Sequence, residues 1–232
     1  MRCPSGHDTE MRVSPEGGRY GGYNAVMTSL IRMHPVNPQR RLVLQVVEML
    51  RHDGLIVYPT DSCYAFGCRM GARGAVERIE RIRRTDRNHN FTLVCRDLSE
   101  IATYAHVDDW AYRLLRAHTP GPYTFILRAM KETPRRLQNA RRRTIGIRVP
   151  DHAVPQEILA EFGEPVMSST MLLPGDPAPL TDAAEIFERL NGQLDLVIDG
   201  GSCGVEPTSV IDLTGSFPKV VRQGKGDISR FA

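Results

Sequence analysis

The chain has 232 residues, of which 41% are hydrophobic and 25% are charged, with a net charge of +3 at pH 7. These values are ordinary for a globular protein that buries a core. No apolar run is long enough to cross a bilayer, so we expect no membrane partner. The net charge is too small to identify a nucleic-acid binder. Basic residues do cluster at 81–87 and 135–143, either as phosphate contacts or as solvated surface.

The cysteines and the first residues of the chain bear on its location and organisation. Five cysteines show no Cys-x-x-Cys pair and no zinc-type spacing, which predicts a reducing, cytoplasmic location and no bound metal. Residues 1–26 contain Gly, Ser, Pro and charge without a signal-peptide core. We interpret them as a disordered extension or a wrongly placed start, and residues 27–232 as a single domain.

The predicted elements alternate between helix and strand. Asn37 and Pro38 predict a helix start, apolar residues at helical spacing follow, and Gly54 ends the helix. Further helices are predicted at 73–84, 97–104, 108–118, 153–162 and 182–190. Strands are predicted at 55–58, 91–95, 123–127, 144–149, 165–169, 195–198, 208–213 and 219–222. This order predicts an α/β fold with helices flanking a sheet, and the late strands without helices between them predict mixed pairing.

The segment that carries most chemical information is residues 58–67, Tyr-Pro-Thr-Asp-Ser-Cys-Tyr-Ala-Phe-Gly. A buried strand here runs into a turn rich in hydroxyls, with one carboxylate and one tyrosine. Clefts of α/β sheets form beyond the carboxyl ends of strands, so this turn is placed to face a ligand. An ordinary strand-to-loop transition, with hydroxyls capping the next element, is the alternative.

This segment resembles the opening Pro-Thr-Glu-Thr-x-Tyr-Gly-x-Gly motif of the YrdC-like family. Four later segments resemble the family's Pro-Gly-Pro-x-Thr, Gly-x-Arg-x-Pro, Pro-Ser-Thr-Val-Val-Asp and Arg-x-Gly motifs, in the same order. They are residues 120–124, 146–150, 207–213 and 221–224. The resemblance covers about residues 33–232, and residues 91–99 and 120–127 look most like the YciO branch.

The resemblance implies a twisted, mixed parallel and antiparallel sheet flanked by helices, with a basic concave cavity. It also implies the activity of threonylcarbamoyl-AMP synthases, a class of nucleotidyltransferase. These enzymes combine L-threonine, bicarbonate and ATP, with Mg²⁺ accompanying the ATP, and release pyrophosphate. Their product is used to modify adenosine in tRNA. Such chemistry brings two anions together, so it needs positive charge and positioning and no nucleophilic side chain.

The matched motifs assign roles to individual residues. Thr60, Asp61 and Tyr64 would line the threonine end of the cavity, and Arg83 matches a catalytic lysine of the family. Arg148 and Arg222 would bind phosphate or adenylate oxygens through paired hydrogen bonds. The nucleotide-binding set implied by the resemblance is Arg84, Pro122, Thr124, Arg148, Ser168, Ser169, Ser209 and Arg222. For Tyr64, a core aromatic with a satisfied hydroxyl is the alternative, and for the stretch around Arg83 it is an exposed helix end.

Two positions depart from the family pattern. The family's Lys-x-Arg pair corresponds here to Arg83 and Thr85, and its Ser-x-Asn motif to Ser169 followed by Thr170 and Met171. An asparagine amide both donates and accepts hydrogen bonds, whereas a methionine does little of either. Two further functions therefore stay open: a YciO-type paralogue that binds AMP, ATP, tRNA or double-stranded RNA without turnover, and a hydrolase of an adenylate.

Overall fold

A computed structural model describes residues 27–85, 91–131, 133–134, 138–139 and 141–231. The interpretation of residues 1–26 lies outside the described residues, as do Arg87, Arg135 and Arg136 of the basic clusters. The helices are α1 (Arg40–Arg51), α2 (Arg73–Arg83), α3 (Leu98–Tyr104), α4 (Asp109–His118), α5 (Ala153–Phe162) and α6 (Ala183–Leu190). In this part of the chain, no helix is both long enough and apolar enough to cross a membrane.

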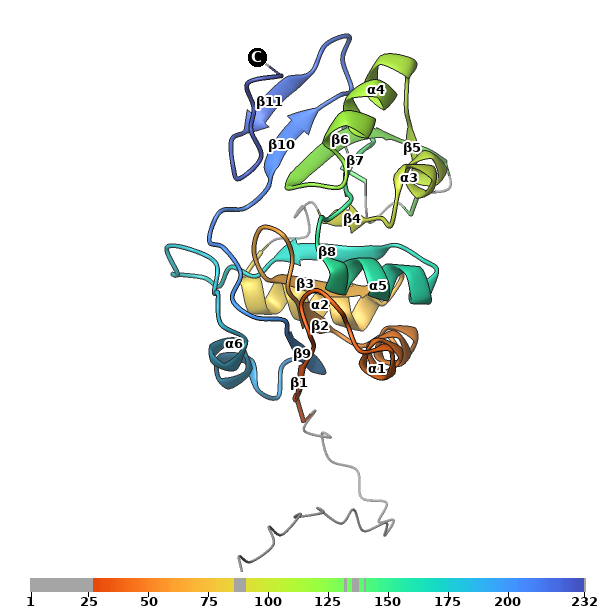
Figure 1. The fold of residues 1–232 in the computed structure, drawn as a ribbon. Helices are drawn as coiled ribbons and strands as arrows, with labels where there is room; N and C mark the ends of the chain where they lie inside the picture. Colours follow the sequence, from red (N-terminus) through yellow and green to blue (C-terminus); the bar gives the residue numbers. More distant parts are fainter. Residues whose placement is uncertain (1–26, 86–90, 132, 135–137, 140, 232) are drawn as a thin grey trace, which may run out of the picture.

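The strands form one mixed sheet in the order β1-β9-β2-β3-β8-β4-β7-β6-β10-β11, and β5 pairs with β6 (Figure 1). Their bounds are β1 (Ser29–Arg32), β2 (Ile56–Tyr58), β3 (Ala65–Arg69), β4 (Thr92–Val94), β5 (Ala105–His106), β6 (Tyr123–Ala129), β7 (Thr144–Arg148), β8 (Val166–Thr170), β9 (Leu196–Asp199), β10 (Ser209–Asp212) and β11 (Lys219–Arg222). Pairing is parallel between β4 and β7 and antiparallel between β3 and β8, for example. The predicted mixed sheet with flanking helices is therefore confirmed.

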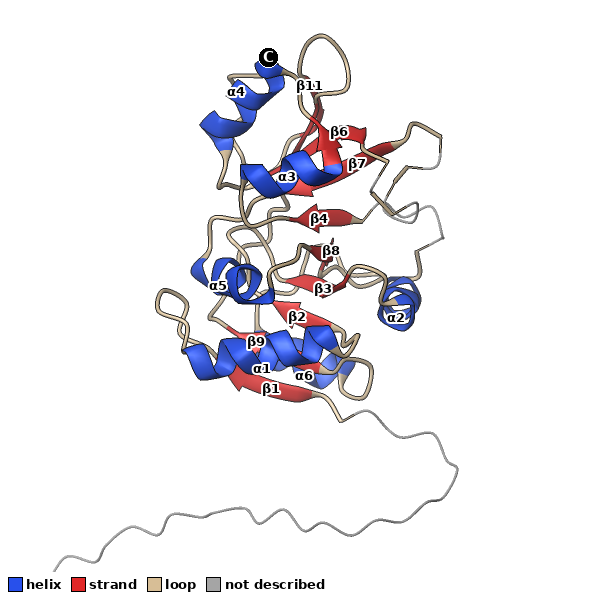
Figure 2. Ribbon diagram, turned by 90° about the vertical axis from the view of Figure 1, so that its right-hand side faces the viewer, coloured by secondary structure: helices blue, strands red, loops and turns tan. Residues whose placement is uncertain are grey.

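The half of the sheet that contains β9, β2 and β3 is covered on both sides. Val47 of α1 and Ile158 of α5 pack into one apolar cluster with β2, and Ile79 of α2 and Ile186 of α6 pack into the other. Figure 2 shows α2 on the opposite side of the sheet from α1 and α5. All three residues of β2 are consequently buried. A strand covered on both sides reads as a continuous apolar run, which is why β2 was predicted from its sequence.

The other half of the sheet leaves one face available for a pocket. In β7, Ile145 and Ile147 join the apolar cluster that includes Leu115 of α4. Successive side chains of a strand point to opposite faces, so Thr144 and Gly146 lie on the other face, where they line a pocket. The same alternation places small and polar side chains along this face of the neighbouring strands. The candidate functional site lies on that face.

Several local predictions need correction. The first helix begins at Arg40 with Gln39 as its N-cap residue, because residues 34–39 form a turn in which the His34 ring accepts hydrogen bonds from the backbone of Val36 and Asn37. The left-handed residue after α1 is Asp53, not Gly54. Strands β1, β3 and β5 were not predicted from the sequence. Strand β3 was hidden inside the segment interpreted as a turn, since Ala65 already belongs to it.

Gly67 in β3 allows a close approach between strands. A Cβ atom built on Gly67 would lie 2.7 Å from Cε1 of Tyr58 and 3.2 Å from Cγ1 of Ile56. We expect Gly67→Ala to lower the free energy of unfolding by about 1–3 kcal/mol, because the buried Tyr58 ring must move. Urea unfolding measures this change.

Gly74 in α2 provides the matched control. A Cβ atom there meets nothing within 4 Å, and the helix favours alanine over glycine. We expect Gly74→Ala to leave stability unchanged or to raise it by up to about 1 kcal/mol. Equal stability of the two variants would contradict this account of Gly67.

Candidate functional site

A polar pocket of about 450 Å³ lies on the open half of the sheet. Its floor is formed by side chains of five neighbouring segments, and hydroxyl groups dominate it. The floor residues are Thr92, Thr124, Thr144, Gly146, Ser168, Ser169, Thr170 and Thr208. Gly146 has no side chain, and a Cβ there would lie 3.4 Å from Thr124. The floor therefore offers many hydrogen-bonding groups and room for a ligand to approach the backbone.

Three arginines surround this floor, and no Asp or Glu is found among the described lining residues. Arg83, the last residue of α2, donates to the Ser169 hydroxyl. Arg222, at the end of β11, donates from Nη2 to the carbonyl of Thr208 at 2.8 Å. Burial lowers the pKa of both guanidinium groups from the usual arginine value. Together with Arg142, these side chains give the pocket a cationic lining.

A buried ion pair lies next to the pocket. Arg148 ends β7, and its Nη2 donates to Oδ1 of Asp61. The side chains are only 9% and 10% exposed. Oδ2 of Asp61 and Nε of Arg148 are buried without a hydrogen-bond partner in the described structure. Such groups are costly to bury unpaired, so each is a candidate contact for a ligand.

Asp61 belongs to the loop between β2 and β3, which folds over the sheet face instead of extending beyond the strand ends. In Figure 1 this loop, drawn in orange, rises in front of β8, and Ser62 and Cys63 line a small pocket together with Thr92 and Arg148. The expectation of a cleft beyond the carboxyl ends of the strands is therefore corrected. The site lies on the face of the sheet, because the described helices of this half, such as α4, pack against the other face.

Hydrogen bonds fix the shape of this loop. The Thr60 hydroxyl donates to the Cys63 carbonyl at 2.6 Å and accepts from the Ser62 amide at 3.1 Å. The Tyr64 hydroxyl donates to the Gly201 carbonyl at 2.6 Å, and burial raises the pKa of Tyr64. Tyr64 is 0% exposed as a whole, which agrees with the alternative of a core aromatic with a satisfied hydroxyl. The residue is nonetheless among those that line the small pocket beside Arg148.

The predicted serines differ in how their hydroxyls are used. Ser168 donates to the carbonyl of Phe66 and accepts from Tyr58, both at 2.9 Å. Ser209 is 0% exposed, and it is Thr208, its neighbour, that lines the pocket and hydrogen-bonds Thr124 at 2.8 Å. The Ser209 hydroxyl donates to the Gly226 carbonyl and accepts from the Gly224 amide. The hydroxyls of Ser168 and Ser209 thus both have hydrogen-bond partners within the protein. Thr208 lies in the same motif, but the sequence does not show which of the two neighbouring hydroxyls faces the pocket.

The remaining positions are also placed by the structure. Arg84 is the left-handed C-cap residue of α2, and Pro122 precedes β6; neither is among the pocket-lining residues. At the departure from the Ser-x-Asn motif, Met171 is fully buried in the core whereas Thr170 lines the pocket. The polar position is therefore Thr170, whose hydroxyl can both donate and accept. The sequence could not distinguish these two positions.

In the described part of the chain, the cysteines near the site are protonated thiols, and no cluster of possible metal ligands is found. Burial raises the pKa of Cys63 and of Cys203 to about 11, so both thiols stay protonated at neutral pH. Among the described residues, His, Cys, Asp and Glu form no group of three that could bind a metal ion. The polar groups that the candidate site offers to a ligand are its arginines, its hydroxyls and the Asp61–Arg148 pair.

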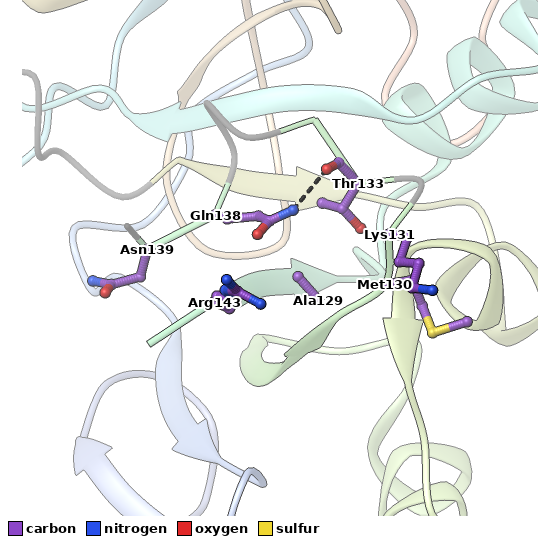
Figure 3. Close-up of a pocket in the computed structure, with 7 residues that line it drawn as sticks. All are labelled: Ala129, Met130, Lys131, Thr133, Gln138, Asn139 and Arg143. Carbon is purple, nitrogen blue, oxygen red and sulfur yellow. Dashed lines mark hydrogen bonds between the residues drawn. The ribbon is translucent and has the colours of Figure 1, made fainter. Parts of the chain in front are cut away.

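A basic surface continues from the pocket toward the start of β7. Arg142 and Thr144 line both the pocket and an adjoining hollow with Arg128 and Arg143. Arg143 also lines a further hollow of about 520 Å³ together with Lys131 (Figure 3). The predicted cluster near residues 141–143 thus joins the pocket instead of forming a separate patch.

Comparisons with known proteins agree with this fold. The Sua5/YciO/YrdC family model, described as "Telomere recombination", matches residues 48–224, so the chain belongs to this family. The protein YciO of Escherichia coli K12, called uncharacterized, is 52% identical over 205 residues, which is 88% of this chain and all of YciO. The crystal structure of E. coli YciO has a TM-score of 0.85 with 51% identity, covering 89% of this chain and 100% of that one.

More distant relatives carry names that describe an activity or a ligand. A threonylcarbamoyl-AMP synthase of Vibrio vulnificus is 26% identical over 159 residues, 67% of this chain and 84% of the synthase. P. abyssi Sua5, solved in complex with L-threonine, has a TM-score of 0.77 at 23% identity. That match covers 84% of this chain and 57% of Sua5, and it shows the shared fold.

His152 links the site to the start of α5. It is the N-cap residue, and its Nδ1 accepts a hydrogen bond from the Val154 amide at 3.1 Å. Burial lowers the pKa of His152 from 6.5, Asp61 and Asp151 raise it, and Arg148 lowers it further. Since Nδ1 accepts, the neutral ring carries its proton on Nε2. Protonation would remove the cap as well as charge a half-buried ring.

We expect this histidine to make the fold less stable in mild acid. Between pH 6.5 and the lower pKa of the folded state, the unfolded chain binds a proton at His152 that the folded chain does not, so the free energy of unfolding falls as the pH decreases through this range. In a His152→Asn variant, the asparagine keeps a capping oxygen but does not titrate. Urea unfolding at pH 7.5 and 5.5 should show a smaller loss for the variant. An equal loss in both proteins would contradict the prediction.

Proposed function

We propose that the protein is an adenylate-forming enzyme of the threonylcarbamoyl-AMP synthase type. It takes L-threonine, bicarbonate and ATP, the last with Mg²⁺, as substrates and releases pyrophosphate. The observation that carries the proposal is the arginine-lined pocket of hydroxyl groups beside the Asp61–Arg148 pair. The names of the distant relatives, a threonylcarbamoyl-AMP synthase and a threonine-bound Sua5, agree with it.

The chemistry fits the groups that are present. The amine of threonine and bicarbonate give a carbamate and water, and a carbamate oxygen then attacks the α-phosphorus of ATP. The bond from that phosphorus to the bridging oxygen breaks, and pyrophosphate leaves. Both reactants are anions, so the barrier falls when cations hold them together. Arg83, Arg142 and Arg222 supply this charge, and the threonine side chains of the floor supply hydrogen bonds to phosphate or ribose oxygens.

The test is pyrophosphate release from ATP by the purified protein. We expect release to require both L-threonine and bicarbonate. Arg222→Met should lower kcat/KM by about 100-fold, since Arg222 faces the pocket and has no carboxylate partner among the described residues. Arg41→Met, an exposed arginine of α1, is the matched control and should leave the rate unchanged. Arg148→Ala is less suitable, because it leaves Asp61 buried without its counter-charge.

Pyrophosphate release without threonine, or no release at all, would contradict the synthase proposal. In the second case, calorimetry with ATP and AMP decides whether the pocket binds nucleotide without turnover. Hydrolysis of supplied threonylcarbamoyl-AMP, with no synthesis, would assign the pocket to an adenylate hydrolase.

A second candidate function is binding of tRNA or double-stranded RNA, and the basic surface that continues from the pocket favours it. Arg128, Arg142, Arg143 and Lys131 lie along this surface. Such cations bind phosphates without reading base sequence.

Affinity for a double-stranded RNA should then fall steeply with salt. We expect the double change Arg142→Gln and Arg143→Gln to reduce the slope of log affinity against log salt concentration by roughly one for each phosphate that the variant no longer binds. Filter binding at several salt concentrations measures the slope. An unchanged slope, compared with Arg41→Met as control, would argue against this surface as the RNA-binding site.

A further inference from the structure

The loop after β11, residues 223–226 and here called the C-terminal loop, is fixed by the Ser209 side chain. The Gly224 amide donates to the Ser209 hydroxyl at 2.9 Å, and this hydroxyl donates to the Gly226 carbonyl at 2.6 Å. Between them, the Lys225 amide donates to the Pro207 carbonyl at 2.9 Å. The backbone on both sides of Lys225 is therefore held against the start of β10.

Two glycines bring the C-terminal loop close to its neighbours. A Cβ atom on Gly224 would lie 2.2 Å from the Pro207 carbonyl oxygen, and one on Gly226 would lie 2.4 Å from Cε1 of Tyr123. Side chains at these positions would push the loop away. With this close packing, the exposed Lys225 side chain reaches the candidate site, where its Nζ donates to the backbone carbonyl of Asp61.

The charge of Lys225 is not compensated by an acid. In the described part of the chain, no ion pair joins Lys225 to a carboxylate, and Asp61 makes its ion pair with Arg148. Burial raises the pKa of Cys63 to about 11, and the charges of Arg148, Lys225 and Arg222 act in the opposite direction. The carboxylate of a ligand that lies beside Asp61 could therefore pair with Lys225 and with the unpartnered Nε of Arg148.

The same place also offers an acceptor for a cation. Oδ2 of Asp61 is buried and has no hydrogen-bond partner in the described structure. A ligand that satisfies Oδ2 of Asp61, Nε of Arg148 and Lys225 must combine a positive and a negative group at short separation. A free α-amino acid has this structure, with its ammonium and carboxylate on one carbon atom.

We propose that Lys225 is a further substrate-binding residue, which pairs with the carboxylate of a free α-amino acid whose ammonium group is bound by Oδ2 of Asp61. Ser209 is then a positioning residue, since it holds the C-terminal loop that carries Lys225. This inference rests on the proposed function and identifies the groups that recognise its amino-acid substrate.

The test compares L-threonine with L-threoninamide, which has an ammonium group and no carboxylate. Calorimetry on the full chain, with a non-hydrolysable ATP analogue present, gives both affinities. We expect Lys225→Met to raise the Kd of L-threonine by about tenfold or more, since a charged hydrogen bond is removed. The Kd of L-threoninamide should stay as in the wild type, because this ligand lacks the group that Lys225 binds.

Three further variants separate this role from general effects. Lys225→Arg keeps the charge and should keep the preference for L-threonine over L-threoninamide. Lys219→Met in β11 removes another exposed lysine and should change neither affinity. Ser209→Ala should raise the Kd of L-threonine while leaving the Kd of L-threoninamide unchanged, which a general loss of structure would not do.

The outcomes are distinguishable. If wild-type protein binds L-threonine and Lys225→Met binds it equally well, Lys225 is not a binding residue and the proposed function is untouched. If both ligands weaken together in Lys225→Met, the pairing of Lys225 with the carboxylate is likewise refuted. If wild-type protein binds no L-threonine with or without the ATP analogue, the proposed function is refuted, and the inference about Lys225 is refuted with it.

Discussion

The guanidinium of Arg148 lies across the face of the sheet and meets the carboxylate of Asp61, joining the end of β7 to the loop after β2. Removing two charges from water costs several kcal/mol for each ion, and this cost is met only when the surrounding groups hold the pair in place. Here the Thr60 hydroxyl fixes the turn and the Tyr64 hydroxyl ties it to Gly201. The shape of the loop, the small pocket under it and the polar atoms left for a ligand all depend on this pair.

A second constraint explains why the surface that forms the pocket floor is polar. Helices cover both sides of the sheet around β2 but only one side around β7. Strands covered on one side alternate between apolar and polar residues, and here the polar positions are mostly threonines. Threonine is suited to this position, because its methyl group packs in a strand while its hydroxyl faces the pocket. The arginines at the rim come from α2, from β11 and from the segment before β7.

Much of this arrangement could be predicted from sequence. The six helices in the described part of the chain were located within a few residues. The motif around Arg148 drew attention to this arginine as a phosphate-binding residue, but its buried ion pair with Asp61 was not predicted. Predictions failed where tertiary contacts decide. Strand β1 has an exposed, short sequence and is a strand only because it pairs with β9. In each of the pairs Thr208 and Ser209, and Thr170 and Met171, only the threonine lines the pocket, and the other residue is buried. The direction of each side chain decides this. None of this is encoded in local spacing.

The position of β9 between β1 and β2 has a consequence for how the chain folds. Leu196 pairs with both Ser29 and Ile56, so the first strands obtain their shared neighbour only from a segment about 140 to 170 residues further along. Such pairings of distant segments are slow to form, because loop closure precedes any gain from the contacts. During synthesis, β1 and β2 therefore wait for most of the chain before this end of the sheet is complete. In the other half of the sheet, the consecutive strands β6 and β7 can pair with each other much earlier, although the edge beyond β6 is completed only by β10 and β11.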